Sequence, residues 1–191
     1  MSPTALVAAS FVALVLQRML ELRLARSNEA AVRARGAVEH GAAHYPLFFV
    51  LHGAWMLAWP TEAMLRGPTL APGWALSFAV FVGAQALRYW AIASLGDRWN
   101  TRVLVVPGDR PLVRGPYRWL RHPNYVAVAL ELASVPLVFG AWITALVAGI
   151  ANALVLMAVR IPCEQRALEW ASAAPRASQA ATRDRTPTPP G

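Results

Sequence analysis

Five long runs of apolar residues alternate with polar segments along the chain. They cover residues 3–22, 45–60, 73–95, 124–139 and 141–159. A helix of about 20 apolar residues is long enough to cross the hydrocarbon core of a membrane. The second run is shorter than that and has to continue into residues 61–65. The pattern predicts an all-α fold, a polytopic membrane helical bundle with about five transmembrane helices.

The last two runs predict a distinct local arrangement. Only Gly140 separates them, and so short a link joins helices that are antiparallel neighbours. We therefore expect a C-terminal helical hairpin. Pro136 lies inside the fourth run, and we expect that helix to bend there because proline removes a backbone hydrogen bond.

The arginines are distributed unevenly between the segments that link the runs. Many follow the first, third and fifth runs, whereas only Arg66 lies between the second and third. Because positively charged loops stay in the cytoplasm, this alternation predicts an external N-terminus and a cytoplasmic C-terminus. The first run has no charge before it and Arg18 near its end, the reverse of a cleaved signal peptide. We expect an integral protein of a bacterial inner (cytoplasmic) membrane.

Composition supports the membrane class and excludes others. Hydrophobic residues make up 57% of the chain and charged residues 15%, which is too apolar for an ordinary soluble domain. All 18 basic residues are arginine, and 10 acidic residues leave a net charge of +8. In so apolar a chain this charge indicates loops at an anionic membrane surface, and we expect membrane lipids rather than nucleic acid as partners.

Cysteine and histidine usage argues against a metal or disulfide framework. Cys163 is the single cysteine, which excludes an internal disulfide and a Cys-based zinc site. His44 and His52 have no nearby acid or thiol in the sequence, so we expect no metal. Residues 173–191 are rich in Ala, Pro, Thr and Ser, which predicts a disordered tail after a membrane domain of residues 1–172.

The candidate chemistry begins in the polar segment before the fourth run. Turn signals and a β-branched stretch at residues 103–106 are typical of a structured connector rather than a floppy loop. The connector ends at His122, and Pro123 suits the first position of a helix. A helix N-terminus presents free N–H groups and a positive dipole end, so it can hold a carboxylate. Glu131 would then lie about two turns into the bilayer, where a carboxylate is costly and usually functional.

A second polar cluster follows the fifth run. Arg160 and Glu164 are four residues apart, which places them on one face of a regular helix. Pro162 lies between them and would disturb that helix. The predicted topology brings this cluster to the same membrane face as His122.

Each of these features also has a plain structural interpretation. The connector arginines can serve only to set topology, His122 can be a solvent-facing helix cap, and Arg160 and Glu164 a surface ion pair. Asn124 and Glu131 can be a packing pair, as can Gln85 and Arg88 with neighbouring helices. Aromatic residues of the connector can be membrane-interface residues: Tyr117, Trp119 and Tyr125.

Taken together, the motifs resemble the isoprenylcysteine carboxyl methyltransferase family of integral membrane enzymes. The resemblance is carried by GPYRWLRHPNY at residues 115–125, an apolar hairpin, and RIPCE at residues 160–164. It covers roughly residues 85–168. The segment that begins QRMLELRLARSNEAAVRARGAVEH resembles a bacterial subgroup that is associated with methylating polyketide-derived lipids such as alkylpyrones.

The resemblance implies an S-adenosylmethionine-dependent O-methyltransferase that acts on a lipophilic carboxylate or enol, such as an isoprenylcysteine-like or polyketide lipid. Arg160 would be the catalytic residue and face the substrate anion, with Glu131 and Arg88 as further substrate-binding candidates. The cofactor-binding residues would lie in the connector and in the last cluster: Arg110, Pro111, Leu112, Val113, Tyr117, His122, Pro123, Asn124, Tyr125 and Glu164. Arg110 to Val113 would contribute mainly backbone contacts.

The chain departs from the family pattern at its C-terminal motif. The family often has two consecutive acids where this chain has Glu164 and Gln165, and Pro162 stands between the paired residues. Two other classes remain open. Membrane reductases of the sterol reductase type share the Arg-His-Pro-Asn-Tyr motif and bind NADPH, but they usually carry an acid at the position of Val128. A non-catalytic membrane scaffold would bind no cofactor.

Overall fold

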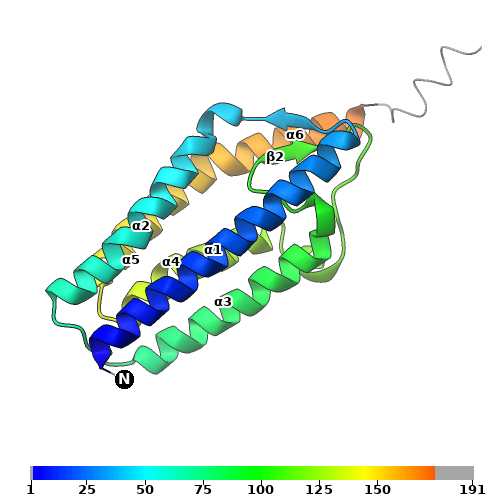
Figure 1. The fold of residues 1–191 in the computed structure, drawn as a ribbon. Coiled ribbons are helices and arrows are strands. Elements are labelled where there is room, and N and C mark those ends of the chain that lie inside the picture. Colours follow the sequence, from blue (N-terminus) through cyan, green and yellow to red (C-terminus); the bar gives the residue numbers. More distant parts are fainter. Residues whose placement is uncertain (1, 175–191) are drawn as a thin grey trace, which may run out of the picture.

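The computed structural model describes residues 2–174, and five long helices form one bundle within that range (Figure 1). They are α1 (Pro3–Ala34), α2 (Tyr45–Leu65), α3 (Trp74–Leu95), α4 (Pro123–Val138) and α5 (Trp142–Val155). The expected all-α membrane bundle is confirmed, and α2 takes up residues 61–65 as its short apolar run required. The expected tail was residues 173–191; Ala173 is the last residue of α6, and residues 175–191 lie outside the described residues.

Three helical stretches within residues 2–174 are long and apolar enough to cross a membrane. They are Pro3–Ala34, Trp74–Arg98 and Trp142–Ala173, and α4 is apolar but shorter. The remaining bundle helix, α2, carries His52, Pro60 and Glu62 along its length, and these residues lower its mean hydropathy. Both α2 and α4 pack against other helices of the bundle, so part of the surface of each contacts protein rather than lipid.

The predicted hairpin is present, and a carboxylate from α2 fastens it. Gly140 turns the chain between α4 and α5 with φ of +71°, a conformation that favours glycine. Glu62 accepts hydrogen bonds from the backbone N–H groups of Ile143 and Thr144 at 3.1 and 2.7 Å. An acid at a helix N-terminus satisfies free donors and complements the dipole, so Glu62 fixes where α5 begins.

The α5 helix does not end at the polar cluster but continues through a π-helical turn into α6. The turn, η4, covers Leu156–Arg160, and α6 covers Ile161–Ala173. Pro162 lies directly after this π turn, near the start of α6, and the helix continues through it to Ala173. Because π turns occur often at functional sites, the π turn at Arg160 favours a functional site at this end of the bundle.

A small antiparallel sheet closes the same end of the bundle. Strand β1 (Val38–His40) pairs with β2 (Val103–Val105), with Val38 opposite Val105. The β-branched stretch of the connector, which was expected to be structured, forms strand β2, and its partner β1 was not foreseen. Three short 3₁₀ turns complete the links: η1 (Ala42–His44), η2 (Gly96–Arg98) and η3 (Gly115–Arg118).

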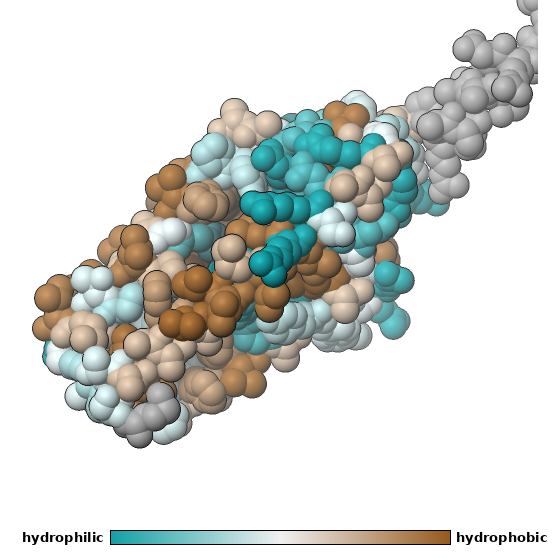
Figure 2. All heavy atoms as spheres, viewed as in Figure 1, coloured by the Kyte–Doolittle hydropathy of each residue, from teal (hydrophilic) through white to brown (hydrophobic). Residues whose placement is uncertain are grey.

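The sheet is anchored by an apolar cluster on α6, which joins Val103 and Val105 to Cys163, Ala167 and Ala171. Figure 2 shows hydrophilic residues gathered at this end and apolar residues over the bundle. We call this the strand end. It brings β1, the connector and α6 together although they are far apart in the sequence (Figure 1).

Candidate functional site

A cavity of about 490 Å³ opens at the strand end and extends into the bundle. Its walls come from α1, α2, α3, the connector, α4 and the continuous α5–α6 helix. Polar groups from both predicted motifs meet on its surface: Tyr117, His122, Asn124, Tyr125, Arg160 and Glu164. The two motifs, about 40 residues apart in the chain, therefore form one site.

A hydrogen-bonded chain of three side chains connects the motifs. The Tyr125 hydroxyl donates to Glu164, and the Arg160 Nε donates to the Tyr125 oxygen at 2.9 Å. Within residues 2–174 this is the one hydrogen bond that the Arg160 side chain makes, although Arg160 is buried and its guanidinium lies over the Phe48 ring. A buried guanidinium keeps its charge, so its remaining donors are available to an anion in the cavity.

His122 lies against this chain. Its ring stacks on Tyr125 with centroids 5.2 Å apart, and its Nδ1 is 3.8 Å from Glu164 Oε1. His122 is the N-cap residue of α4, but its side chain makes no capping hydrogen bond and is only 17% exposed, so it is not a solvent-facing cap. His122 Nε2 and Asn124 Oδ1 are buried without a hydrogen-bond partner in the described part of the chain. Buried polar atoms are rarely left unpaired, which makes these two atoms candidates for binding a ligand group.

The other predicted cofactor residues fall into two groups. Arg110, Pro111 and Leu112 line the cavity, as the resemblance implied. Val113 is 75% exposed and Pro123 is fully buried at the start of α4, and neither is among the lining residues. Pro123 therefore has a structural place as the first residue of the helix.

Two titratable groups at the strand end are held neutral at pH 7. Burial raises the pKa of Tyr117, and the charge of Glu164 adds to this rise. Burial lowers the pKa of His44, and so does the positive charge of Arg160. Neither group therefore competes with Arg160 or Glu164 for a charged ligand.

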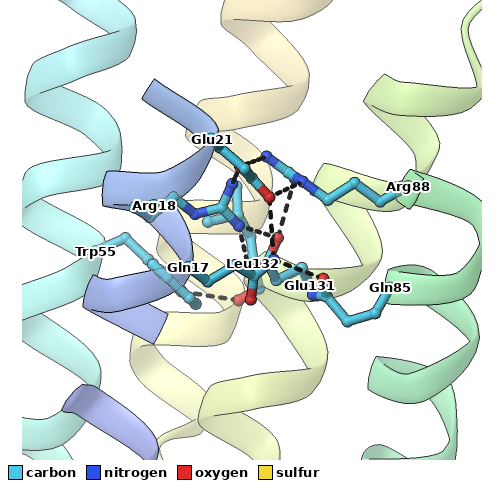
Figure 3. Close-up of polar contacts among 8 residues, drawn as sticks. All are labelled: Gln17, Arg18, Glu21, Trp55, Gln85, Arg88, Glu131 and Leu132. Carbon is cyan, nitrogen blue, oxygen red and sulfur yellow. Dashed lines mark hydrogen bonds and ion pairs between the residues drawn. The ribbon is translucent and has the colours of Figure 1, made fainter. Parts of the chain in front are cut away.

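Deeper in the bundle lies a buried cluster of four charged side chains, which Figure 3 shows. Arg88 donates to Glu21 at 2.6 Å and to Glu131 at 3.1 Å, and Arg18 donates to the same two acids. Two arginines and two glutamates make the cluster electrically balanced, as buried charges require. Gln17 donates to Gln85 at 2.7 Å beside it.

This cluster bears on the predicted substrate residues. Arg88 lines the cavity, whereas Glu131 is 2% exposed and lies behind it. Because both side chains are already paired, a direct role in binding substrate stays a prediction. Glu131 accepts its hydrogen bonds from Arg18 and Arg88, and none from Asn124 within residues 2–174, so Asn124 and Glu131 do not form the hydrogen-bonded packing pair that their spacing allowed.

Sequence reasoning missed two parts of the site. Arg88 and Glu131 pair with Arg18 and Glu21 of α1. Arg18 was interpreted as flanking charge and Glu21 was not singled out, although two charged residues three positions apart on an apolar helix gave a signal. Asn152 also lines the cavity and was not singled out, although it is the one amide in an otherwise apolar α5. Within residues 2–174, no group of three or more His, Cys, Asp or Glu could hold a metal ion.

Comparison with known proteins identifies a family whose model matches this chain. The model of the "Isoprenylcysteine carboxyl methyltransferase (ICMT) family" matches residues 75–170. The match spans the connector, the hairpin and α6, which are the elements that build most of the cavity wall. No solved structure matches the chain.

Two bacterial relatives match over most of their length. YpbQ of Bacillus subtilis, described as an uncharacterized protein, is 42% identical over 156 residues, which is 82% of this chain and 92% of YpbQ. An uncharacterized protein of Haemophilus influenzae is 27% identical over 160 residues, covering 83% of this chain and 92% of that protein. Both matches are longer than the family segment, so the likeness to these relatives extends beyond it.

Proposed function

The chain belongs to the isoprenylcysteine carboxyl methyltransferase family of membrane enzymes, and on that premise we propose that it is an S-adenosylmethionine-dependent O-methyltransferase. We place its site in the cavity at the strand end, on the cytoplasmic face of the bacterial inner membrane. Its acceptor would be a lipophilic carboxylate or enol. The observation that supports this best is the chain Arg160–Tyr125–Glu164, which sets a free cation and an acid in one cavity.

The polar groups of the cavity fit the proposed cofactor. S-adenosylmethionine carries an ammonium group, a carboxylate and a sulfonium centre, and when bound it supplies an electrophilic methyl group. Glu164 would hold the ammonium group by a charge-assisted hydrogen bond. The unpaired Nε2 of His122 and the start of α4 would hold the carboxylate. The loop of Arg110, Pro111 and Leu112 would cover the remainder.

Arg160 would orient the acceptor. A carboxylate or acidic enol is already ionised at neutral pH, so its oxygen needs no strong base. Catalysis then rests on holding that oxygen in line with the methyl group and excluding water. Arg160 can pair with the oxygen anion through its terminal donors while Tyr125 fixes its Nε. Tyr125 thereby couples the acceptor side of the cavity to the cofactor side.

The membrane setting suits a lipid acceptor. On the side of α1 and α2 the cavity is lined in part by apolar residues, among them Met19, Phe49 and Met56. Met19 and Phe49 are also exposed on the bundle surface, where lipid would surround them. A lipid tail would therefore enter between α1 and α2 directly from the bilayer.

The test is calorimetry on the detergent-purified protein, with S-adenosylmethionine and NADPH titrated in parallel. We expect the first to bind. Glu164→Gln should weaken that binding about 10- to 100-fold, because one hydrogen bond to a charged group is lost. Glu169→Gln, an exposed acid on the same helix, is the matched control and should bind normally.

Turnover separates the roles of the linked residues. Methyl transfer would be followed to N-acetyl-S-farnesylcysteine, a lipophilic carboxylate, and to a long-chain 4-hydroxy-2-pyrone, a lipophilic enol. Arg160→Ala should keep cofactor binding and lower turnover, and Tyr125→Phe should lower turnover less. Binding of NADPH alone would contradict the proposal and favour the reductase, whereas binding of neither by folded protein would favour a scaffold.

A further inference from the structure

Asn152 stands out in the cavity because nothing in the described chain pairs with it. It lies in α5, is 1% exposed and lines the cavity. Neither its amide nitrogen nor its amide oxygen has a hydrogen-bond partner within residues 2–174. An unpaired buried amide loses its hydration without compensation. A side chain that carries such a cost is a candidate for binding a ligand.

Contacts between α2 and α5 fix the depth of Asn152. Glu62 of α2 bonds to Thr144 near the start of α5, and Phe48 lies against Arg160 at its end. Asn152 is halfway between these two contacts, level with the middle of α2. Eight residues of helix separate it from Arg160, which corresponds to about 12 Å at 1.5 Å per residue.

At this depth the described residues offer Asn152 no hydrogen-bond partner. The members of the buried charge cluster that line the cavity, Arg18, Glu21 and Arg88, already pair with one another and with Glu131. The Nδ1 of His52 bonds to the carbonyl of Phe48 at 2.8 Å. Apolar side chains such as Met56, Val128 and Leu156 line much of the remaining wall. A plain alkyl chain in this part of the cavity would leave both amide atoms unpaired.

Another buried asparagine shows what a structural amide looks like in this fold. Asn28 of α1 donates from its Nδ2 to the carbonyl oxygens of Trp99 and Gly96, at 2.7 and 3.2 Å. It thereby fastens α1 to the link that follows α3. Within residues 2–174 Asn152 makes no such contact, although it is the more deeply buried of the two.

We propose that Asn152 is a specificity-determining residue, which recognises a second oxygen group on the acceptor lipid about 12 Å from the oxygen that is methylated. A hydroxyl fits best, since it accepts from the amide nitrogen and donates to the amide oxygen. This proposal rests on the proposed function for the position of the methylated oxygen. It adds that the preferred acceptor carries an oxygen along its chain.

Ligand-induced stabilisation of the detergent-purified protein tests the proposal without cofactor or turnover. The probes are octadecanoic acid and 10-hydroxyoctadecanoic acid, which differ only in the mid-chain hydroxyl. The shift in melting temperature gives each dissociation constant. We expect the hydroxy acid to bind the wild-type protein roughly tenfold more tightly, as one buried hydrogen-bonding site would provide. Asn152→Leu, of similar volume, should bind both acids equally.

The unliganded variants provide the matched control. Asn28→Leu breaks two hydrogen bonds and should lower the melting temperature by roughly 2–8 °C. Asn152→Leu should leave it unchanged or raise it, because an unpaired polar group is removed. A loss in Asn152→Leu as large as in Asn28→Leu would overturn the proposal, since the amide would then be structural.

The binding measurements supply the other outcomes that would overturn the proposal. Equal binding of the two acids by the wild-type protein overturns the proposal, as does a hydroxyl preference that survives in Asn152→Leu or the absence of binding by either acid. The proposed function fails on a different result, the absence of S-adenosylmethionine binding in calorimetry. The two failures are therefore distinguishable.

Discussion

The buried charge cluster allows a quantitative prediction about the stability of the bundle. Glu131 accepts hydrogen bonds from Arg18 and Arg88, and its side chain is almost completely buried. Glu131→Gln keeps the shape but leaves two arginines facing Glu21 alone. Breaking one partner of a buried ion pair costs about 3–5 kcal/mol, because a charge is left uncompensated. For a chain of this size that corresponds to a fall of roughly 6–20 °C in melting temperature.

The same cluster allows a rescue. Adding Arg88→Met to Glu131→Gln leaves Arg18 with Glu21, a balanced pair that is joined in the wild-type protein. We expect the double variant to lose less than the sum of the two single losses, with a coupling of about 2 kcal/mol or more. Fluorescence-detected unfolding of the detergent-purified protein measures all three variants.

An exposed ion pair supplies the control. Asp97 pairs with Arg35 at 2.8 Å, and its side chain is 46% exposed. Asp97→Asn makes the same acid-to-amide change and should cost less than about 1 kcal/mol. If Glu131→Gln cost no more than Asp97→Asn, the cluster would be hydrated rather than buried. If the double variant lost the full sum, charge balance would not be the reason for its stability.

Two further predictions concern the strand end. Gly41→Ala should destabilise the protein by about 1–3 kcal/mol more than Gly36→Ala. Both glycines have positive φ, but only at Gly41 would the new Cβ meet Cys163 Sγ, at 2.6 Å. Equal melting temperatures of the two variants would refute this. Although burial opposes it, hydrogen bonds from two arginines, Arg102 foremost, lower the pKa of Glu39. Its stabilising contribution should thus be complete above the ordinary pKa of 4.5 and fall as the pH drops below it. Thermal unfolding across that range should show a smaller loss of stability in Glu39→Gln than in the wild type, and equal losses would contradict this.

The sequence by itself determined the main helices and marked most of the residues on which the proposed function rests. The apolar runs gave the helices because each must satisfy its backbone groups internally in lipid. Gly140 and Pro123 marked the hairpin and the start of α4 because their backbone restrictions are local. The motif around His122 and the one around Glu164 could be recognised as short strings, and most of their residues line one cavity.

Only the tertiary structure decided which of these residues meet. The pairing of β1 with β2, the link from Arg160 through Tyr125 to Glu164, and the cluster around Glu131 all join segments that lie far apart in the chain. Periodicity places a side chain on a face but does not say what packs against that face. Asn152 shows this most clearly, because an amide in an apolar helix looks the same in sequence whether it is paired or not, and only its surroundings in the bundle leave it free to bind a ligand.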